Sequence, residues 1–429
     1  MNKWVKLGDL IQSVSKTHKF NKKELVFLNT SDVLEGKILV NSYMPVSKMK
    51  GQAKKTIQNG DILYSEIRPK NKRYAYVKNL DKVDDYVVST KLMVLRNQSD
   101  KLDTDYLYHF LTSEEAINYL QNRAENRIGS FPQITFEIVK SLNIWLPNLS
   151  TQQKIASVLS ALDDKIELNN QINAELEQMA KTLYDYWFVQ FEFPCQPEPV
   201  EGDTMLRQAQ HDNLGYKSSG GKMVYNDVLK REIPEGWEVK KLGEIGNFKN
   251  GVNYDPANPG EIACPIINVR NISSSSYFIK NEDLDIIFLN INDVRKYSVN
   301  NDSIIIARSG IPGATRLIYE CAPNTLYCGF AIHYEIYDKN LKIIAFFLLK
   351  SLEETIKNGS GGTIMKNVNQ AILNELTLVI PDKQTISDFN KYLESIFQKI
   401  NNLEKQSQEL AQLRDWLLPM LMNGQVKVV

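Results

Sequence analysis

Two long stretches of the chain carry apolar residues at alternating spacings of three and four. The first runs from Gln152 to about Gln190 without a glycine or proline, and the second begins near Ile386. This heptad spacing, sustained over about five repeats, predicts two long helices that pair as a coiled coil. The predicted seam consists of Ile155, Leu159, Leu162, Ile166, Leu176, Leu183, Ile386, Phe389, Leu393, Ile396, Ile400, Leu403, Leu410 and Leu417.

Polar residues interrupt both seams, at Asn169, Asn173, Ser407 and Arg414. Buried polar side chains at such positions often fix the register or orientation of paired helices at some cost in stability. The alternative is that each long helix packs only on its own globular domain. Two matching helices in one chain favour their pairing with each other.

The sequence contains a long internal repeat. WVKLGDL at Trp4 to Leu10 returns as WEVKKLGEI at Trp237 to Ile245, and GDILYSEIRP at Gly60 to Pro69 returns as NDSIIIARSGIP at Asn301 to Pro312. The matches keep the same order, each roughly 235 to 240 residues from its partner, and chance rarely gives such an order. A period of this length indicates two copies of a whole domain, each with an appended helix.

Short β-rich runs in each copy, punctuated by glycine, proline and asparagine, precede one amphipathic helix, near Tyr106 to Leu120 and near Leu341 to Lys357. The chain is therefore predicted to have an α+β fold, with two mixed domains separated by a long antiparallel two-helix coiled coil in a pseudo-two-fold internal repeat. The expected segments are a first domain at 1–150, a first helix at 151–191, a linker at 192–232, a second domain at 233–381 and a second helix at 382–424.

The charges of the chain balance, with 51 lysines and arginines against 51 aspartates and glutamates among 429 residues. Zero net charge argues against a protein that coats nucleic acid indiscriminately, but it is compatible with local basic surfaces. Four cysteines without a C-x-x-C pair and four scattered histidines support neither a zinc site nor a disulfide framework. The start lacks a signal-peptide core, and the longest apolar run, Ile343 to Leu349, is too short to span a membrane, so we expect a cytoplasmic protein.

No motif of a catalytic site occurs in the sequence. GYKSSGGKM at Gly215 to Met223 fails the spacing of a phosphate loop, and GSGGT at Gly359 to Thr363 lacks the G-x-G-x-x-G pattern. H-E-x-x-H and G-x-S-x-G are absent, and the acidic pairs are interpreted as solvated faces. We therefore expect no enzymatic activity, no metal site and no cofactor in this chain.

One segment, Lys48 to Lys78, departs from the balanced charge, with nine basic residues against two acidic ones. Its part RPKNKRY follows a strand-like run and is predicted to be a loop whose guanidinium, ammonium and amide groups suit phosphates and base edges. The alternative is a solvated lysine-rich face. The candidates for DNA contact are Arg68, Lys70, Lys72 and Arg73 here, and Arg308 and Arg316 around the equivalent loop SGIPGA of the second copy.

A second pair of loops stands before the last predicted strand of each copy, RIGSFPQI at Arg127 to Ile134 and GSGGTIMKNV at Gly359 to Val368. Glycine at these places would let backbone amides approach a phosphate closely. Tight turns without a ligand are the alternative. The candidates for DNA contact are Arg127, Ser130 and Gln133 in the first loop, and Thr363 and Lys366 in the second.

This organisation resembles the specificity subunit of type I restriction–modification systems over essentially the whole chain. The most specific residues are YKSSGGKMVYNDVLKREIPEGWEVKKLGEI at Tyr216 to Ile245. The twin passages at Leu146 to Asn169 and Ile380 to Glu404, each a strand, a proline and a helix, are nearly as specific. Two features depart from the family pattern: no glutamate precedes the glutamine at either helix start, and Glu198 to Asn213 forms an extra linker segment.

The resemblance implies that each mixed domain is a target-recognition domain, which reads one half of a split, asymmetric DNA target through the major groove. The paired helices would set the number of unread base pairs and dock two methyltransferase subunits. Those subunits would bind S-adenosylmethionine and methylate adenine, and would recruit endonuclease subunits that use ATP and magnesium. This chain would then be a non-catalytic partner of double-stranded DNA and of both subunit types, and would not contact membranes.

Other functions compete with this one. A coiled-coil scaffold that binds only proteins is disfavoured by the basic loop, and a DNA-binding protein that acts alone is disfavoured by the zero net charge. A self-contained restriction enzyme is disfavoured by the missing motifs. Apolar positions beside the seam look suited to partner helices, at Leu168, Ile172, Met179, Tyr184, Tyr186, Trp187 and Phe188.

Overall fold

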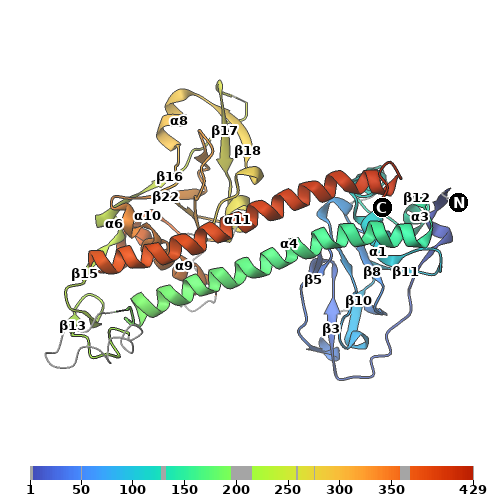
Figure 1. Ribbon diagram of the computed structural model, residues 1–429, viewed down its shortest axis with the longest axis horizontal. Coiled ribbons are helices and arrows are strands. Elements are labelled where there is room, and N and C mark those ends of the chain that lie inside the picture. The colour runs from blue at the N-terminus through green and yellow to red at the C-terminus, as the bar shows by residue number, and fades with distance from the viewer. Residues whose placement is uncertain are drawn as a thin grey trace. The chain divides into compact units, whose positions relative to one another are not determined.

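The chain folds into two compact units. The computed structural model describes residues 3–49, 51–126, 132–194, 215–257, 259–274, 276–357 and 368–428. The first unit comprises Met1–Asn169 and Lys405–Val429, and the second comprises Asn170–Glu404. Two long helices, α4 (Leu149–Tyr184) and α11 (Lys383–Met422), each begin in one unit and end in the other (Figure 1).

The first domain is rich in short strands. Its elements are β1 (Lys3–Lys6), β2 (Ile11–Ser13), β3 (Glu24–Leu28), β4 (Val33–Leu34), β5 (Lys37–Ile38), β6 (Met44–Pro45), β7 (Ala53–Thr56), β8 (Ile62–Ser65), β9 (Tyr74–Tyr76), β10 (Tyr86–Ser89), β11 (Leu92–Asn97), α1 (Thr104–Thr112), α2 (Glu114–Glu125), α3 (Phe136–Lys140) and β12 (Asn143–Leu146). They form two four-stranded sheets, β6-β3-β10-β7 and β2-β11-β8-β9, and the pairs β1-β12 and β4-β5.

The second domain begins with a short hairpin, β13–β14. Its elements are β13 (Met223–Asn226), β14 (Arg231–Pro234), β15 (Glu238–Lys241), α6 (Leu242–Ile245), β16 (Gly246–Asn250), β17 (Ile262–Ile267), α7 (Val269–Ser274), β18 (Asp285–Leu289), α8 (Ile291–Tyr297), β19 (Ile304–Ala307), β20 (Thr315–Leu317), β21 (Leu326–Tyr327), β22 (Ala331–Ile336), α9 (Lys342–Lys357), α10 (Gln370–Glu375) and β23 (Thr377–Ile380). The strands pair as β13-β14, β15-β23, β16-β22-β19-β20 and β18-β17-β21.

The two domains share one topology. The sheet β16-β22-β19-β20 corresponds to β2-β11-β8-β9, and the pair β15-β23 corresponds to β1-β12. A parallel pair recurs in the other sheet, as β3 with β10 and as β17 with β21. Strand β7 has no counterpart in the described part of the second domain. The predicted α+β fold and the predicted internal repeat are therefore confirmed in the order of the strands.

Strands β8 and β19 are buried on both faces because a core lies on each side of them. Ile62 and Tyr64 of β8 face a core that contains the helices of the first domain, whereas Leu63 faces a second core shared with β3. In the same way Ile304 and Ile305 of β19 face different cores. The alternation follows from the two-residue period of a strand, and apolar β-branched residues fit such a site.

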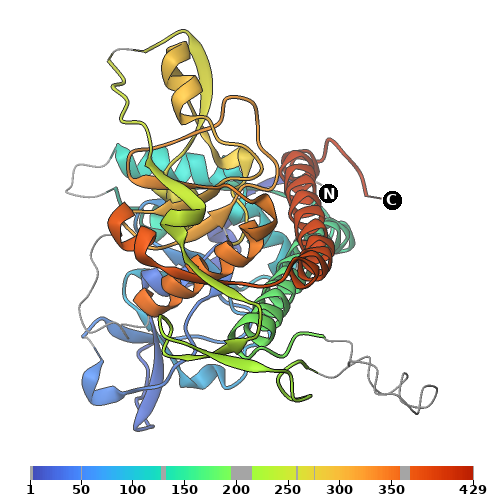
Figure 2. The same ribbon diagram turned by 90° about the vertical axis from the view of Figure 1, so that its left-hand side faces the viewer.

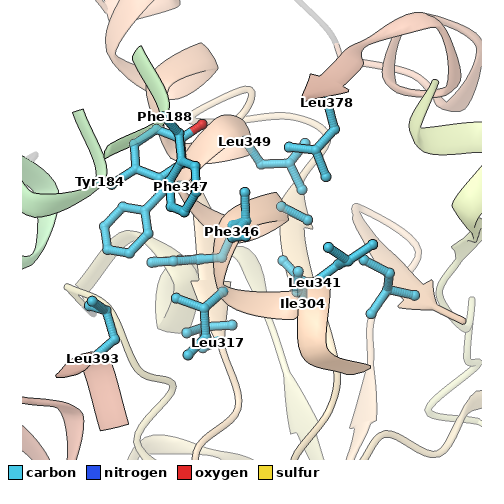
Figure 3. Close-up of a cluster of buried hydrophobic side chains, with 14 of the residues drawn as sticks. Tyr184, Phe188, Ile304, Leu317, Leu341, Phe346, Phe347, Leu349, Leu378 and Leu393 are labelled. Carbon is cyan, nitrogen blue, oxygen red and sulfur yellow. The ribbon is translucent and has the colours of Figure 1, made fainter. Parts of the chain in front are cut away.

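Each long helix contributes to both cores. The start of α4 packs Ile155 and Leu159 into the first unit, and its end packs Tyr184 into the second. Figure 3 shows Tyr184 beside Phe347 of α9, and the two rings stack with centroids 5.1 Å apart. The end of α11 packs Leu418 into the core of the first unit. Packing on a globular domain therefore accompanies the pairing of the helices rather than replacing it.

The two helices pair in antiparallel fashion within both units. In the first unit, Asn169 donates to the Ser407 hydroxyl at 3.2 Å, and Arg414 donates to Asp163 at 2.7 Å. In the second unit, the Asn173 amide group donates to the Ile400 carbonyl at 3.5 Å. Partner numbers fall along α11 as they rise along α4, as an antiparallel pair requires. Figure 2 again shows the helices side by side.

Residues of the predicted seam are buried to different extents. Its fully buried members belong to a domain core, namely Ile155, Leu159, Ile386, Phe389, Leu393 and Ile400. Its other members are half-buried: Leu176, Leu183, Ile396 and Leu417 pack against a domain core, whereas Leu162, Ile166, Leu403 and Leu410 belong to none of the core clusters.

Neither a membrane-crossing segment nor a metal centre is found in the part of the chain that the structure describes. No helix there is both long and apolar enough to cross a bilayer. No cluster of three or more histidine, cysteine, aspartate or glutamate side chains could hold a metal ion there.

Candidate nucleic-acid interface

Three chain segments meet at the same place in each domain. In the first domain, the backbone N–H of Glu66 donates to the Lys91 carbonyl at 3.1 Å, and the Glu66 carbonyl accepts from the N–H of Ile134 at 2.8 Å. The segments are the β8–β9 loop, the β10–β11 turn and the chain before α3. We call this meeting point the junction of the domain.

The second domain contains the same junction with different side chains. The N–H of Arg308 donates to the Phe330 carbonyl at 2.9 Å, and the Arg308 carbonyl accepts from the N–H of Val368 at 3.2 Å. The corresponding segments are the β19–β20 loop, the β21–β22 turn and the chain before α10. In each domain, the two loops that the sequence singled out therefore meet. One residue at the edge of each loop takes part in the junction, Glu66 with Ile134 in the first domain and Arg308 with Val368 in the second.

A helix anchors the β8–β9 loop of the first domain. The N–H of Lys70 donates to the side-chain oxygen of Gln121, a buried residue of α2, at 3.1 Å. The N–H of Arg68 donates to the Pro132 carbonyl at 3.1 Å. Arg68 and Lys72 both adopt positive φ angles, of 45° and 51°, which close the loop tightly. These backbone contacts hold the loop against α2 and the chain before α3.

The basic side chains of this loop have different surroundings. Arg68 and Lys70 are exposed. Arg73 instead donates to the carbonyls of Ser31 at 3.0 Å and Val33 at 3.3 Å, so its guanidinium holds the neighbouring turn. The ammonium of Lys72 lies 3.4 Å from the carboxylate of Glu35. This pair is exposed and weak, so Lys72 can exchange its partner for a phosphate.

Lys55 belongs to the basic segment but points inward. It is buried, and its ammonium donates to the Thr90 carbonyl at 3.1 Å and to the Leu92 carbonyl at 2.7 Å. Burial lowers the pKa of Lys55, while the nearby Glu66 carboxylate acts in the opposite direction. Because its two acceptors flank Lys91, the buried cation fixes the turn at the junction. Strand β7 supplies it, and the described part of the second domain contains no counterpart of this strand.

The two arginines proposed around the loop of the second domain occupy opposite environments. Arg308 is exposed, and its side chain makes no hydrogen bond or ion pair with the residues that the structure describes. Arg316 is buried and donates to the Glu353 carboxylate at 2.9 Å. The guanidinium of Arg316 is therefore held inside the domain, and we leave this residue out of the DNA-contacting set.

The remaining candidates lie near the junction or outside the described residues. Gln133 is half-buried and forms a β-bridge with Ile67 at the base of the loop. The candidates that fall outside the described ranges are Arg127, Ser130, Thr363 and Lys366. Sequence reasoning did not single out Lys91 or Phe330, although their turn occupies matching positions in the two copies.

A groove between α4 and α11 lies in the second unit. It has a volume of about 920 Å³ and is lined by Ala174, Glu175, Gln178, Met179, Thr182, Leu183, Tyr186, Tyr392, Ser395 and Ile396. Met179 is 51% exposed and Tyr392 is 56% exposed. On the same helices, the first unit exposes Leu413 and Trp416. Such exposed apolar side chains on a helix pair are typical of a protein-binding surface.

Not all of the apolar positions predicted for partner helices are available. Met179 and Tyr186 are exposed, as is Leu168. Trp187 and Phe188 are instead buried in the core of the second unit, as Tyr184 is, because the helix ends in a π turn at Asp185–Val189 that faces Phe389 of α11. These three aromatic residues are thus structural, which corrects the expectation from sequence.

Comparison with known proteins gives a consistent picture. A family model described as type I restriction modification DNA specificity domain matches residues 1–178 and 234–412. The chain is 32% identical to the type I restriction enzyme HindI specificity subunit of Haemophilus influenzae, over 98% of each protein. It is 28% identical to the MjaIX specificity subunit of Methanocaldococcus jannaschii, over 80% of this chain and 75% of that protein.

A solved structure has a similar fold. The type I restriction–modification S subunit from M. genitalium superposes with a TM-score of 0.50 at 18% sequence identity, covering 98% of this chain and 96% of that one.

Proposed function

Because the chain belongs to the family of type I restriction–modification DNA specificity subunits, we propose that each of its two domains reads one half of a bipartite DNA target at its junction. A specificity subunit is not itself catalytic, since methylation and cleavage reside on the other subunits of the complex. The recognition of two separate half-sites is the finer part of the proposal, and it rests on the duplicated junction.

The observation that carries the proposal is the exposed Arg308 at the second junction, matched by the basic loop at the first. Arg308 projects from an ordered hairpin and has no partner among the described residues. A free guanidinium on a rigid scaffold suits the acceptor pair of guanine in the major groove. Around the first junction, Arg68, Lys70 and Lys72 offer donors to phosphates and base edges. The two domains thus present different chemistry on one framework, as an asymmetric target requires.

The helices would set the distance between the half-sites. Helix α4 has 36 residues, which corresponds to about 54 Å at 1.5 Å per residue. A helical turn of DNA spans roughly 34 Å, so helices of this length suffice to separate two reading sites by a turn or more. The polar contacts Asn169–Ser407 and Asp163–Arg414 support a fixed register, because a slip along the seam would bury these groups unpaired.

The same helices would bind two methyltransferase subunits. The groove that contains Met179 and Tyr392 supports one docking place, and the exposed pair Leu413 and Trp416 supports a second. Met179 and Leu413 stand at equivalent places of the repeat. S-adenosylmethionine would then bind the methyltransferase subunits, which methylate adenine, while ATP and magnesium would serve the endonuclease subunits. Such a complex acts on DNA, so we place the chain in the cytoplasm.

Single-molecule sequencing of methylated DNA tests this function. A host that expresses the chain with its methyltransferase subunit should carry a bipartite methyladenine motif, and the motif should vanish when this chain is deleted. Arg308→Ala and Arg68→Ala should each weaken the reading of one half of the motif, so each variant should methylate the bipartite motif less. Methylation that does not depend on the chain would contradict the proposed function.

A further inference from the structure

Phe330 stands directly opposite Arg308 at the second junction. The last ladder pair between β19 and β22 is Ala307 with Ala331, and the next step of that register places Arg308 against Phe330. The hydrogen bond from the Arg308 N–H to the Phe330 carbonyl, 2.9 Å long, continues the ladder by this step. The backbones of Arg308 and Phe330 are thus adjacent at the junction, and both side chains are exposed there.

The side chain of Phe330 is 62% exposed although its backbone is firmly held. The N–H of Gly329 donates to the Val252 carbonyl at 2.8 Å, and the N–H of Ala331 donates to the Cys328 carbonyl at 2.9 Å. An added Cβ at Gly329 would lie 1.9 Å from the side-chain oxygen of Asn253, so the Asn253 side chain packs directly against this turn. The turn therefore holds the Phe330 backbone in place and exposes its apolar ring to solvent.

No other aromatic ring in the described part of the chain stacks on Phe330. A single exposed apolar residue is common on protein surfaces. This one differs because it is ordered, because it lies beside an unpaired arginine, and because it is at the convergence of three segments. An apolar side chain beside an arginine matches a thymine beside a guanine in the major groove, where the thymine C5-methyl is the apolar feature.

We propose that Phe330 is a specificity-determining residue that contacts the C5-methyl group of a thymine next to the base pair read by Arg308. This inference rests on the proposed function. It assigns a chemical reason to one position of the second half-site. The first domain carries Lys91 opposite Glu66 at the corresponding place, so its half-site is read there by charged groups instead.

Replacement of thymine by uracil tests the contact because it removes the methyl group alone. The full complex of this chain with its methyltransferase subunits is titrated with duplexes in which each thymine of the second half-site is replaced in turn. One replacement should weaken binding by about fourfold, the effect expected for one buried methyl group. Phe330→Ala should weaken binding to the thymine duplex and should show no further loss with uracil at that position.

Tyr337→Ala is the matched control, because Tyr337 is 68% exposed and follows the other end of β22. This variant should retain the fourfold discrimination. A Phe330→Ala complex that still distinguishes thymine from uracil would overturn the proposal, and so would a wild-type complex insensitive to every replacement. If the wild-type complex directs no bipartite methylation at all, the proposed function fails instead, so the two failures are distinguishable.

Discussion

The Arg316 guanidinium donates to the Glu353 carboxylate at 2.9 Å, and both side chains are almost completely buried. The same carboxylate lies 3.0 Å from the ammonium of Lys350 and accepts from the Thr315 N–H at 3.2 Å. Burial, together with the charge of Arg316, lowers the pKa of Lys350. Glu353 thus holds helix α9 to the base of the hairpin that carries Arg308. Of the two arginines of this hairpin, Arg316 stabilises the fold, whereas Arg308 is exposed at the junction.

We expect Arg316→Met to lower the free energy of unfolding by about 3 to 5 kcal/mol, because it leaves Glu353 buried without its main counter-charge. Arg308→Ala should change it by less than about 0.5 kcal/mol, since Arg308 is exposed. Denaturant unfolding of both variants makes the comparison. The double variant Arg316→Met, Glu353→Leu should recover much of the loss, and equal destabilisation by Arg308→Ala and Arg316→Met would contradict the assignment.

Asn173→Leu should stabilise the helix pair by about 1 to 2 kcal/mol. The side-chain oxygen of Asn173 is buried and has no hydrogen-bond partner among the described residues, and its amide nitrogen makes only the 3.5 Å contact to Ile400. An unsatisfied buried acceptor costs about 1 to 3 kcal/mol. Asn169→Leu is the comparison, because it also removes the bonds to Gln406 and Ser407. In thermal unfolding, Asn173→Leu should have a higher midpoint temperature than Asn169→Leu. A midpoint of Asn173→Leu below that of the wild type would contradict the prediction.

Glu404 should make the stability of the protein depend on pH. Burial raises its pKa to about 7, Lys280 opposes this effect, and the carboxylates of Glu177 and Glu282 reinforce it. The folded protein then keeps a proton that the unfolded chain releases at about pH 4.5. The free energy of unfolding should therefore decrease as the pH rises from about 4.5 to 7, and then level off.

Glu404→Gln removes this titration, so it should flatten the decrease and raise the stability at pH 8. Chemical unfolding at a series of pH values measures both effects. Glu175→Gln is the control, since Glu175 is exposed on α4 and should leave the profile as in the wild type. A Glu404→Gln profile that still falls over the same range would show that other groups carry the dependence.

Met179→Asp and Tyr392→Asp should each weaken the binding of the methyltransferase subunit at least tenfold. Both residues line the groove between α4 and α11, and a carboxylate there would be desolvated in a complex. Isothermal titration with the purified subunit measures the loss. Phe288→Asp serves as the control, because Phe288 is half exposed on β18 and does not line the groove. Undiminished binding by both groove variants would place the docking surface elsewhere.

The sequence predicted the long helices and the repeat well because both depend on periodicity. The antiparallel pairing was also predicted, and the structure places hydrogen bonds between the helices at Asn169, Ser407 and Arg414, the polar residues that interrupt the seam. The sequence did not predict that the aromatic residues at the end of α4 are buried. Trp187 and Phe188 continue the apolar spacing, and only the π turn and the core of the second unit decide that they are interior.

The candidate interface was predicted less completely. Arg308 and Arg316 are equivalent by composition and spacing, and the difference between them comes from Glu353, which lies far along the chain. Lys54 and Lys55 are adjacent, and only the pairing of β7 with β10 determines which of them faces the interior. Phe330 was not singled out from the sequence, because its exposure depends on its place in the β21–β22 turn, which no sequence pattern marks.

Leu418, Leu421 and Met422 of α11 belong to the core that surrounds Tyr106 and Leu107 of the first domain. During synthesis on the ribosome, those leucines and the methionine emerge after the whole of the second unit has been made. The nascent first domain must therefore wait with part of its apolar core uncovered until translation of α11 is finished. The unit that is translated first is thus the one completed last. A chain truncated before the final turns of α11 would therefore lose part of the apolar core of its first unit.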